Sequence, residues 1–327
     1  MPHAIRVHSY GGPEVLRWEE AEAGEPGPGQ ARIRQHAAGV NYIDVYHRTG
    51  LYPQPSLPFT PGSEGAGEVI AVGEGVTDVA VGDRVAYAGP IGGYSEERLI
   101  PADRLVKLPD AISYETGAAM MLQGMTVRYL LKQTYPVAKG SVILWHAAAG
   151  GVGLVACQWA SALGATVIGT VGSDEKAALA KAHGAAHTID YRTENWVARV
   201  KELTGGRGVD AAYDSVGKDT FPGSLDCIKP RGLWVSFGNA SGPVPPFEIG
   251  VLAQKGSLYA TRPTLFTHIA SREALLENAN DLIDAVSGGL VKIQVGRTYQ
   301  LAEAAQAHRD LEARKTTGSI VLLAGGA

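Results

Sequence analysis

A glycine cluster near the middle of the chain has the spacing of a dinucleotide-binding turn. In SVILWHAAAGGVGLVACQWA, Ala148 stands at the first position of G-x-G-x-x-G, and Gly150 and Gly153 stand at the second and third. An apolar strand pattern precedes the cluster and a helical pattern follows it. Backbone N–H groups without side chains can approach a pyrophosphate at a helix N-terminus. We therefore predict phosphate binding by Gly150, Gly151, Val152 and Gly153. The alternative is a glycine cluster that only packs a helix.

A second glycine-rich stretch, PGSEGAGEVIAVGEGV at residues 61–76, invites the same interpretation. Its glycines Gly65 and Gly67 are followed by a strand pattern, so no helix N-terminus is available to bind phosphate. We expect these glycines to serve turns and close packing.

The end of the next predicted strand indicates which nicotinamide cofactor binds. An NAD site usually has an acidic residue about 20 residues after the glycines. Here the strand ends at Gly172 and Ser173, and Lys176 lies one turn into the following helix. A hydroxyl and an ammonium group favour a 2′-phosphate, which predicts NADP(H). The alternative is that Asp174 accepts from the ribose and Lys176 is solvated, although Asp174 also suits the start of the helix.

The order of predicted elements defines an α/β protein with two domains. Residues 1–110 are rich in short strands, whereas strands alternate with helices of 10–15 residues from Ser141 to about Arg262. Such alternation predicts a doubly wound parallel sheet. The tail after Thr264 is too short for a third domain. We therefore expect a Rossmann domain at 123–263, and a second domain formed by 1–122 and 264–327.

Composition excludes several classes of protein. The 327 residues carry a net charge of −4 and no basic cluster, which argues against nucleic acid as a partner. Two cysteines, Cys157 and Cys227, provide no disulfide framework and suit a reducing compartment. Neither a secretory signal pattern nor an apolar run of about 20 residues is evident. We expect a cytoplasmic location.

Several segments together resemble a known family. AAAGGVGLVACQWA, PGSEGAG, AGVNYIDVYHRTGLYP, YDSVG and SFGNASG are similar to the zinc-independent, zeta-crystallin-like quinone oxidoreductases of the medium-chain dehydrogenase/reductase superfamily. The resemblance extends over essentially the whole chain. It implies a GroES-like β-barrel catalytic domain completed by the tail, an inserted Rossmann domain, NADPH-dependent quinone reduction and a homodimer formed through the Rossmann sheets.

The resemblance also implies that no catalytic zinc is bound. Zinc alcohol dehydrogenases use Cys, His and Cys where this chain has Asn41, Ser63 and the cysteine-free QGMTV. With only two cysteines, a structural zinc lobe of four cysteines is also absent. We interpret Glu64 as a structural hydrogen-bond acceptor.

The same resemblance places VNYIDVYHRTGLYP at the substrate cleft between the domains. Its candidate catalytic residues are Asn41, Asp44, Tyr46 and Tyr52. The two tyrosines would flank a quinone and donate from their hydroxyls, and Asn41 would donate from its amide. Tyr46 as a core residue is the alternative, and we expect Tyr42 to be structural. For the cofactor the resemblance adds Thr126, Tyr191, Ser215, Phe237, Gly238 and Arg314, and for the substrate cleft Arg262.

A quinone accepts hydride readily and its reduced anion is delocalised, so hydrogen-bond donors can replace a metal ion. The predicted activity is quinone reduction by hydride, or by stepwise electron transfer. A reductase of α,β-unsaturated carbonyls is the first alternative, because it needs the same hydride geometry. An NADPH-binding structural or RNA-binding protein is the non-enzymatic alternative, although the acidic net charge argues against RNA.

Overall fold

The computed structural model describes residues 1–325, and the chain divides into two compact units. The first contains Met1–Met125, Ile269–Ser287 and the chain from Ile293 onward, and the second contains Thr126–His268 and Gly288–Lys292. The predicted domain limits at residues 122 and 263 lie a few residues before the boundaries between the two units, which follow Met125 and His268. The exact domain limits stay a prediction.

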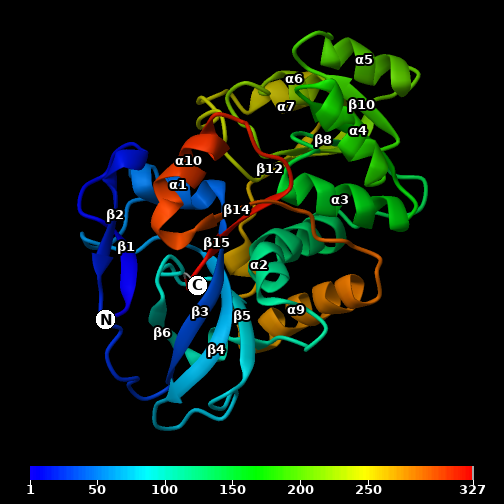
Figure 1. Cartoon of the computed structure of the whole chain (residues 1–327). Coiled ribbons are helices and arrows are strands. Elements are labelled where there is room, and N and C mark those ends of the chain that lie inside the picture. The colour runs from blue at the N-terminus through cyan, green and yellow to red at the C-terminus, as the bar shows by residue number, and fades with distance from the viewer. Residues whose placement is uncertain (326–327) are drawn as a thin grey trace. The chain divides into compact units, whose positions relative to one another are not determined.

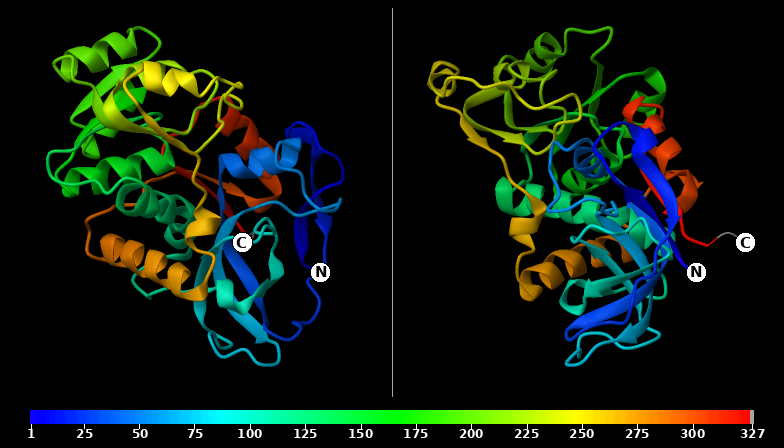
Figure 2. Two further views of the ribbon diagram at one scale, coloured as in Figure 1. Left: turned by 180° about the vertical axis from the view of Figure 1, so that it is seen from behind. Right: turned by 90° about the vertical axis from the view of Figure 1, so that its left-hand side faces the viewer.

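The first unit is built on a mixed sheet in which the tail returns to the N-terminal strands (Figure 1). Within residues 1–325 its order is β14-β15-β3-β4-β5-β7, with β6 also paired to β3. Strand β15 runs antiparallel to β3, with Ile320 opposite Val40, which confirms the predicted return. The same neighbours can be followed in Figure 2. The strands are β3 (Gln30–Val40), β4 (Glu64–Val72), β5 (Arg84–Ala88), β6 (Glu97–Pro101), β7 (Val106–Lys107), β14 (Val295–Gln300) and β15 (Ser319–Leu323).

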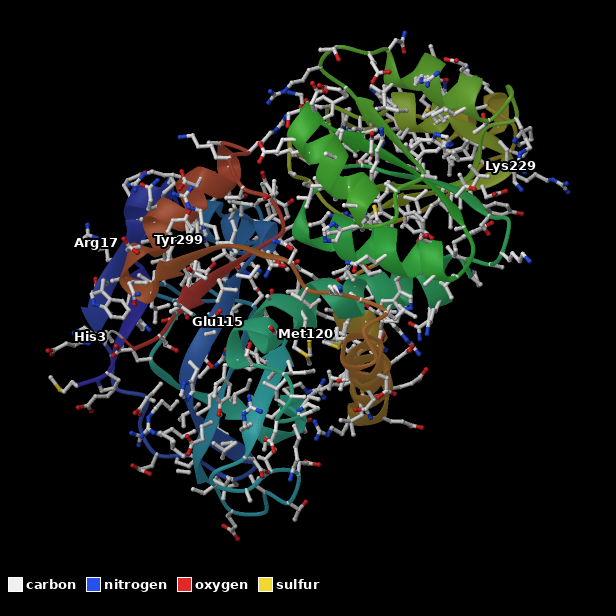
Figure 3. The ribbon with its side chains drawn as sticks, turned by 45° about the vertical axis from the view of Figure 1, so that its right-hand side comes forward. His3, Arg17, Glu115, Met120, Lys229 and Tyr299 are labelled. Carbon is white, nitrogen blue, oxygen red and sulfur yellow. The ribbon has the colours of Figure 1, made fainter. Side chains whose placement is uncertain are left out.

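A small antiparallel pair, β1 (His3–Val7) and β2 (Leu16–Glu20), lies beside this sheet in the first unit. His3 stacks on Trp18 with ring centroids 5.1 Å apart, and Figure 3 labels His3 and Arg17 on the two strands. Strand β2 was not among the predicted elements, because LRWEE buries only Leu16 and therefore shows no apolar alternation.

Among the described residues, four α-helices lie wholly or mainly in the first unit. They are α1 (Tyr42–Thr49), α2 (Tyr114–Tyr129), α9 (Arg272–Ser287) and α10 (Ala304–Glu312). Helix α1 starts after Asn41 and ends at Gly50, whose φ of 80° favours glycine. Short 3-10 turns occur at Pro13–Val15, Ala102–Arg104 and Leu301–Glu303. Helix α2 continues into a π-helix at Leu130–Thr134, which the sequence pattern did not distinguish from an α-helix.

The second unit contains a fully parallel sheet in the order β10-β9-β8-β11-β12-β13. This is the Rossmann order 3-2-1-4-5-6, and the direction of winding reverses between β8 and β11. The predicted doubly wound sheet is confirmed. Its strands are β8 (Val142–Trp145), β9 (Thr166–Val171), β10 (His187–Asp190), β11 (Val209–Asp214), β12 (Ile228–Ser236) and β13 (Tyr259–Thr261).

The helices between these strands pack on the sheet and enclose its core. The longer ones, α3 (Gly151–Ala162), α4 (Asp174–Ala182) and α5 (Trp196–Leu203), were predicted. The short α6 (Gly223–Asp226), α7 (Gly250–Gln254) and α8 (Leu265–His268) were not, since four or five residues are too few for a periodic pattern. Core side chains such as Leu144, Ile168 and Ile189 fill one cluster.

Candidate functional site

The predicted phosphate turn lies between β8 and α3, at the point where the sheet reverses its winding. Gly150 is the N-cap of α3 and Gly151 is its first residue. A Cβ on Gly153 would lie 2.4 Å from the Ala147 carbonyl oxygen and 2.7 Å from the Ala148 backbone. The helix therefore approaches the strand end too closely for any side chain at residue 153, which is the role of the third glycine in such turns.

The residues predicted to bind the 2′-phosphate gather at the carboxyl ends of β9 and β10. A Cβ on Gly172 would lie 2.7 Å from the Tyr191 hydroxyl, so this phenol lies against the glycine. The Ser173 hydroxyl caps α4 by accepting from the Lys176 backbone N–H at 3.3 Å. Asp174 is the exposed first residue of α4 and does not cap it. The ribose alternative for Asp174 thus stays open.

Three further predicted cofactor residues lie together at the carboxyl ends of β11 and β12. A Cβ on Gly238 would lie 2.4 Å from the Ser215 carbonyl oxygen. The Phe237 ring centroid lies 5.6 Å from that of Trp145 at the end of β8. Ser215, Phe237 and Gly238 therefore share one edge of the sheet with the phosphate turn, as their positions after parallel strands require.

Asp214, which was not predicted from the sequence, stabilises this edge of the sheet through several hydrogen bonds. Its carboxylate accepts from the backbone N–H groups of Val216 and Gly217 and from the hydroxyls of Thr220 and Ser224. Burial alone would raise its pKa, but His146 and these hydrogen bonds hold the pKa below its ordinary value. The YDSVG segment could have indicated this role of Asp214, because an aspartate before a tight turn can accept from the backbone N–H groups that follow it.

His146 and Cys157 are both buried and have packing roles. The His146 ring nitrogens contact the hydroxyls of Thr170 and Ser224 at 3.0 Å each, and burial lowers its pKa. Burial also raises the pKa of the Cys157 thiol to about 12, so it is not a reactive thiolate.

The remaining cofactor and cleft predictions are more scattered along the chain. Thr126 is buried in α2, and Arg262 is exposed and directly follows β13. Arg314 follows α10 in the first unit with a φ of 58°. Their roles stay predictions.

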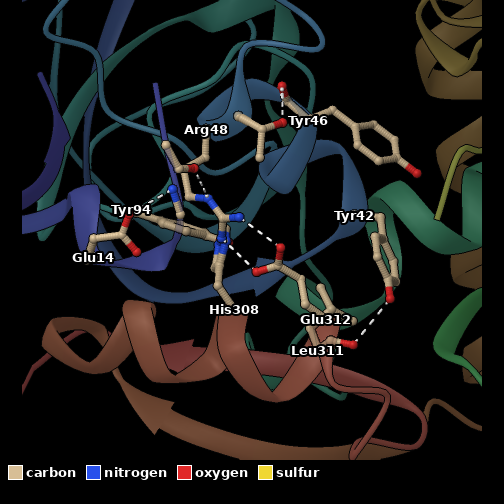
Figure 4. Close-up of polar contacts among 11 residues, drawn as sticks. Glu14, Tyr42, Tyr46, Arg48, Tyr94, His308, Leu311 and Glu312 are labelled. Atoms are coloured by element: carbon tan, nitrogen blue, oxygen red, sulfur yellow. Dashed lines mark hydrogen bonds and ion pairs between the residues drawn. The ribbon is translucent and has the colours of Figure 1, made fainter. Parts of the chain in front are cut away.

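In the first unit, α1 and the segment after it present the aromatic residues predicted for substrate. The rings of Tyr46 and Tyr52 meet edge to face with centroids 5.2 Å apart. The Tyr52 backbone N–H donates to the Tyr46 carbonyl oxygen at 3.1 Å, which fixes their separation. Tyr42 donates from its hydroxyl to the Leu311 carbonyl oxygen, in agreement with a structural role (Figure 4).

The structure does not support a direct contact of Asp44 with substrate. Its side chain is completely buried and accepts from the Asn41 backbone N–H, the Ser63 hydroxyl and the Tyr94 hydroxyl. Burial raises its pKa to about 6, although these donors oppose the shift. Asp44 therefore joins the start of α1 to Ser63 and Tyr94 and leaves no oxygen facing solvent.

The hydrogen bonds around Asp44 continue from Tyr94 to three residues that were not predicted from the sequence, namely His308, Arg48 and Glu312 (Figure 4). Arg48 donates to His308 Nδ1 at 3.1 Å and forms two 2.9 Å hydrogen bonds with Glu312. Because a guanidinium only donates, His308 carries its proton on Nε2, which lies 3.2 Å from the Tyr94 hydroxyl oxygen. Burial, with Arg48, lowers the His308 pKa to about 3, so the imidazole is neutral.

Glu64 is the second fully buried carboxyl group of this region. Its Oε1 accepts from Asn41 Nδ2 at 2.6 Å and its Oε2 accepts from the Leu122 backbone N–H at 2.7 Å. Burial, aided by the nearby Asp44 charge, raises its pKa to about 8. Glu64 therefore accepts hydrogen bonds, as we expected, and its donors are the Asn41 amide and the Leu122 backbone N–H.

The donor set at this place does not fit a zinc ion. Zinc in proteins takes thiolate, imidazole and carboxylate ligands, whereas residues 41 and 63 supply an amide and a hydroxyl that already bond to Glu64 and Asp44. Within the described residues, no group of three or more His, Cys, Asp or Glu side chains is arranged to hold a metal ion.

Comparison with known families defines the class of this chain. Residues 27–110 match the alcohol dehydrogenase GroES-like domain, and residues 151–283 match the zinc-binding dehydrogenase domain. These two domains define a medium-chain dehydrogenase/reductase, which confirms the predicted GroES-like and Rossmann architecture. No helix in the described part of the chain is long and apolar enough to cross a membrane.

Individual relatives define the family more closely. A quinone oxidoreductase of Pseudomonas aeruginosa is 56% identical over 324 residues, covering 99% of this chain and 100% of the relative. The solved Escherichia coli quinone oxidoreductase complexed with NADPH has a TM-score of 0.97 and 49% identity, covering 98% and 99% of the two chains. A 2-haloacrylate reductase of Burkholderia is 47% identical, covering 99% of each chain. The chain therefore belongs to the zeta-crystallin-like quinone oxidoreductase family, as the resemblance predicted.

Proposed function

We propose that the protein reduces quinones with NADPH and without a metal ion. The observation that carries this proposal is the glycine turn at Gly150–Gly153, placed where the parallel sheet reverses its winding. Full-length similarity to quinone oxidoreductases, one of them solved with NADPH, supports it. The donor set at residues 41 and 63 supports the absence of zinc.

The carboxyl edge of the Rossmann sheet would hold the cofactor. NADPH, when bound, supplies the hydride. The Gly150–Gly153 turn would bind the pyrophosphate, and Ser173, Lys176 and Tyr191 would bind the 2′-phosphate, for which an ammonium group and hydroxyls are suitable partners. The remaining proposed cofactor contacts are Thr126, Gly172, Ser215, Phe237, Gly238 and Arg314. Arg262, which follows the last strand, is proposed to contact substrate.

Hydrogen-bond donors near α1 would stabilise the developing negative charge on the quinone. We assign this role to the Asn41 amide and to the hydroxyls of Tyr46 and Tyr52, whose rings also suit contact with a flat substrate. Reduction by hydride would then need one proton from water to form the hydroquinone, and reduction by two successive electrons would need two protons. Asp44 has no part in substrate contact and instead holds the start of α1.

We also propose a cytoplasmic homodimer. Strand β13 is an edge of the parallel sheet, and Tyr259 on this strand and Ile249, ten residues earlier in the chain, are 63% and 80% exposed. An unpaired strand edge with apolar neighbours is suited to pairing with a second copy. Both cysteines are buried free thiols, which suits a reducing compartment.

A second candidate function is reduction of α,β-unsaturated carbonyls, which the 47% identity to a 2-haloacrylate reductase favours. Hydride would add to the β-carbon and a proton from water to the α-carbon, and the same donors would stabilise the enolate oxygen. Steady-state rates with 1,4-benzoquinone and with a 2-alkenal distinguish the two. We expect kcat/KM to be higher for the quinone, and the opposite ranking would make the enone the substrate.

A further inference from the structure

A chain of hydrogen-bonded, buried polar side chains passes through the Asn41 amide. The Ser319 hydroxyl donates to Gln123 Oε1 at 2.8 Å, and Gln123 Nε2 donates to Asn41 Oδ1 at 3.0 Å. Asn41 Nδ2 then donates to Glu64 Oε1 at 2.6 Å. The four residues come from β15, α2, the N-cap of α1 and β4, so the chain joins four elements of the first unit.

These hydrogen bonds run in one direction. Both Glu64 oxygens accept, one from Asn41 and the other from the Leu122 backbone N–H. Asn41 Nδ2 faces Glu64 Oε1, and Asn41 Oδ1 faces the Gln123 amide nitrogen. An amide nitrogen carries two hydrogens, and the Glu64 contact uses one of them. The orientation of Asn41 thus follows from its two neighbours.

Close packing restricts movement of this chain. Asn41, Glu64, Gln123 and Ser319 are all buried. A Cβ on Gly39 would lie 2.3 Å from Glu64 Oε1 and 2.4 Å from the Ala118 carbonyl oxygen, so strand β3 presses directly on the carboxyl group. Glu64 therefore has little room to turn away from Asn41.

We propose that Glu64, Gln123 and Ser319 are positioning residues that hold the Asn41 amide so that its second N–H donates to the substrate carbonyl oxygen. This inference rests on the proposed contact between Asn41 and the quinone. A donor held by such a chain costs little reorganisation when charge develops on the oxygen. Loss of this positioning should therefore lower kcat/KM for the quinone and leave the NADPH Kd unchanged.

The first test separates the contact from its positioning. We expect Asn41→Leu to lower kcat/KM for 1,4-benzoquinone about 100-fold, Gln123→Leu about 10-fold and Ser319→Ala about 3-fold, with the NADPH Kd unchanged. The matched control is Gln35→Leu, because Gln35 is a buried glutamine of the same unit that bonds to Tyr87 and Gly93 instead. It should lower Tm and leave the quinone kinetics unchanged.

A donor–acceptor exchange separates positioning from stability. Asn41→Asp alone places two carboxyl groups together and should lower Tm. Adding Glu64→Gln restores a hydrogen bond between residues 41 and 64 with its direction reversed, so Tm should recover. Quinone kcat/KM should stay low, because residue 41 then no longer donates.

Two results would overturn the positioning role while the proposed contact survives. One is a loss with Asn41→Leu but wild-type kinetics for Gln123→Leu. The other is full recovery of quinone kcat/KM by the Asn41→Asp, Glu64→Gln double variant. Wild-type kinetics for Asn41→Leu itself would instead remove the contact on which the inference rests.

Discussion

The phosphate turn of the second unit and the polar region around α1 in the first unit are built by opposite means. The turn works because side chains are missing: Gly153 lies too close to Ala147 and Ala148 for any Cβ. The α1 region works because particular side-chain and backbone donors contact both carboxyl oxygens of Asp44 and of Glu64. The first should therefore be disrupted by adding atoms and the second by removing single polar groups.

The largest effect is expected from Gly153→Ala. The added Cβ meets rigid backbone at 2.4 Å, so the helix must move away from the strand end. We expect a loss of about 1–3 kcal/mol in the free energy of unfolding and an NADPH Kd raised about 100-fold.

The matched stability control for the turn is Gly150→Ala, whose Cβ would have only one neighbour, at 3.3 Å. Denaturant unfolding measures the free energy of unfolding of both variants, and fluorescence titration measures the NADPH Kd of Gly153→Ala. Equal losses of unfolding free energy in the two variants would show that close helix–strand approach is not what the turn requires.

Glu64 should make the stability of the fold depend on pH. Its folded pKa of about 8 lies above its ordinary value of 4.5, so the folded state keeps a proton that the unfolded chain has already released. This contribution is fully present below pH 4.5 and is lost as pH rises through 8. Asp44 acts in the same direction but only up to about pH 6.

Of these two carboxyl groups, only Glu64 still titrates between pH 6 and 8, and the buried histidines, whose unfolded pKa of 6.5 lies in this range, contribute equally to wild-type protein and to a Glu64→Gln variant. Wild-type protein should lose about 2–3 kcal/mol across this range relative to Glu64→Gln, measured by urea unfolding at each pH. Parallel pH profiles for the two proteins would rule out a buried carboxyl with a raised pKa.

Removing the Lys176 ammonium should affect one cofactor only. Lys176→Ala is expected to raise the NADPH Kd ~10–150-fold, equivalent to ~1.5–3 kcal/mol, and to leave NADH binding nearly unchanged. Lys181, in the last turn of the same helix, provides the control Lys181→Ala. If NADPH and NADH weaken equally, the assignment of Lys176 to the 2′-phosphate is wrong.

The smallest expected effect comes from one hydroxyl of the aromatic pair. Tyr52→Phe keeps the edge-to-face contact with Tyr46 but removes a donor. We expect kcat/KM for 1,4-benzoquinone to fall ~2–10-fold, corresponding to one hydrogen bond of ~0.5–1.5 kcal/mol. Tyr42→Phe, which loses the hydrogen bond to the Leu311 carbonyl oxygen, is the control. A larger effect of Tyr42→Phe than of Tyr52→Phe would show that the substrate contact has been assigned to the wrong tyrosine.

The same contrast explains how much the sequence could predict. The strands and helices of the Rossmann sheet and its glycine turn depend on neighbours within a few residues, and a local pattern reveals them. The return of the tail to the first domain was predicted because too few residues remained for a third domain and because the family resemblance implied it, whereas its pairing with β3 was not predicted.

The polar region around α1 has no local pattern. Gln123 lies 82 residues from Asn41, Ser319 lies 196 from Gln123, and His308 lies 214 from Tyr94. Only folding brings these residues together. The resemblance drew attention to Asn41, Ser63 and Glu64, but not to their partners. It also predicted a substrate contact for Asp44, whose complete burial the sequence did not reveal.

The most direct test of the central claim is oxidation of NADPH by 1,4-benzoquinone, followed at 340 nm with protein freed of metal by a chelator. We predict full activity without added zinc, one NADPH consumed per quinone reduced, and a much lower kcat/KM with NADH. Activity that requires stoichiometric zinc, or no quinone-dependent NADPH oxidation at all, would contradict the account.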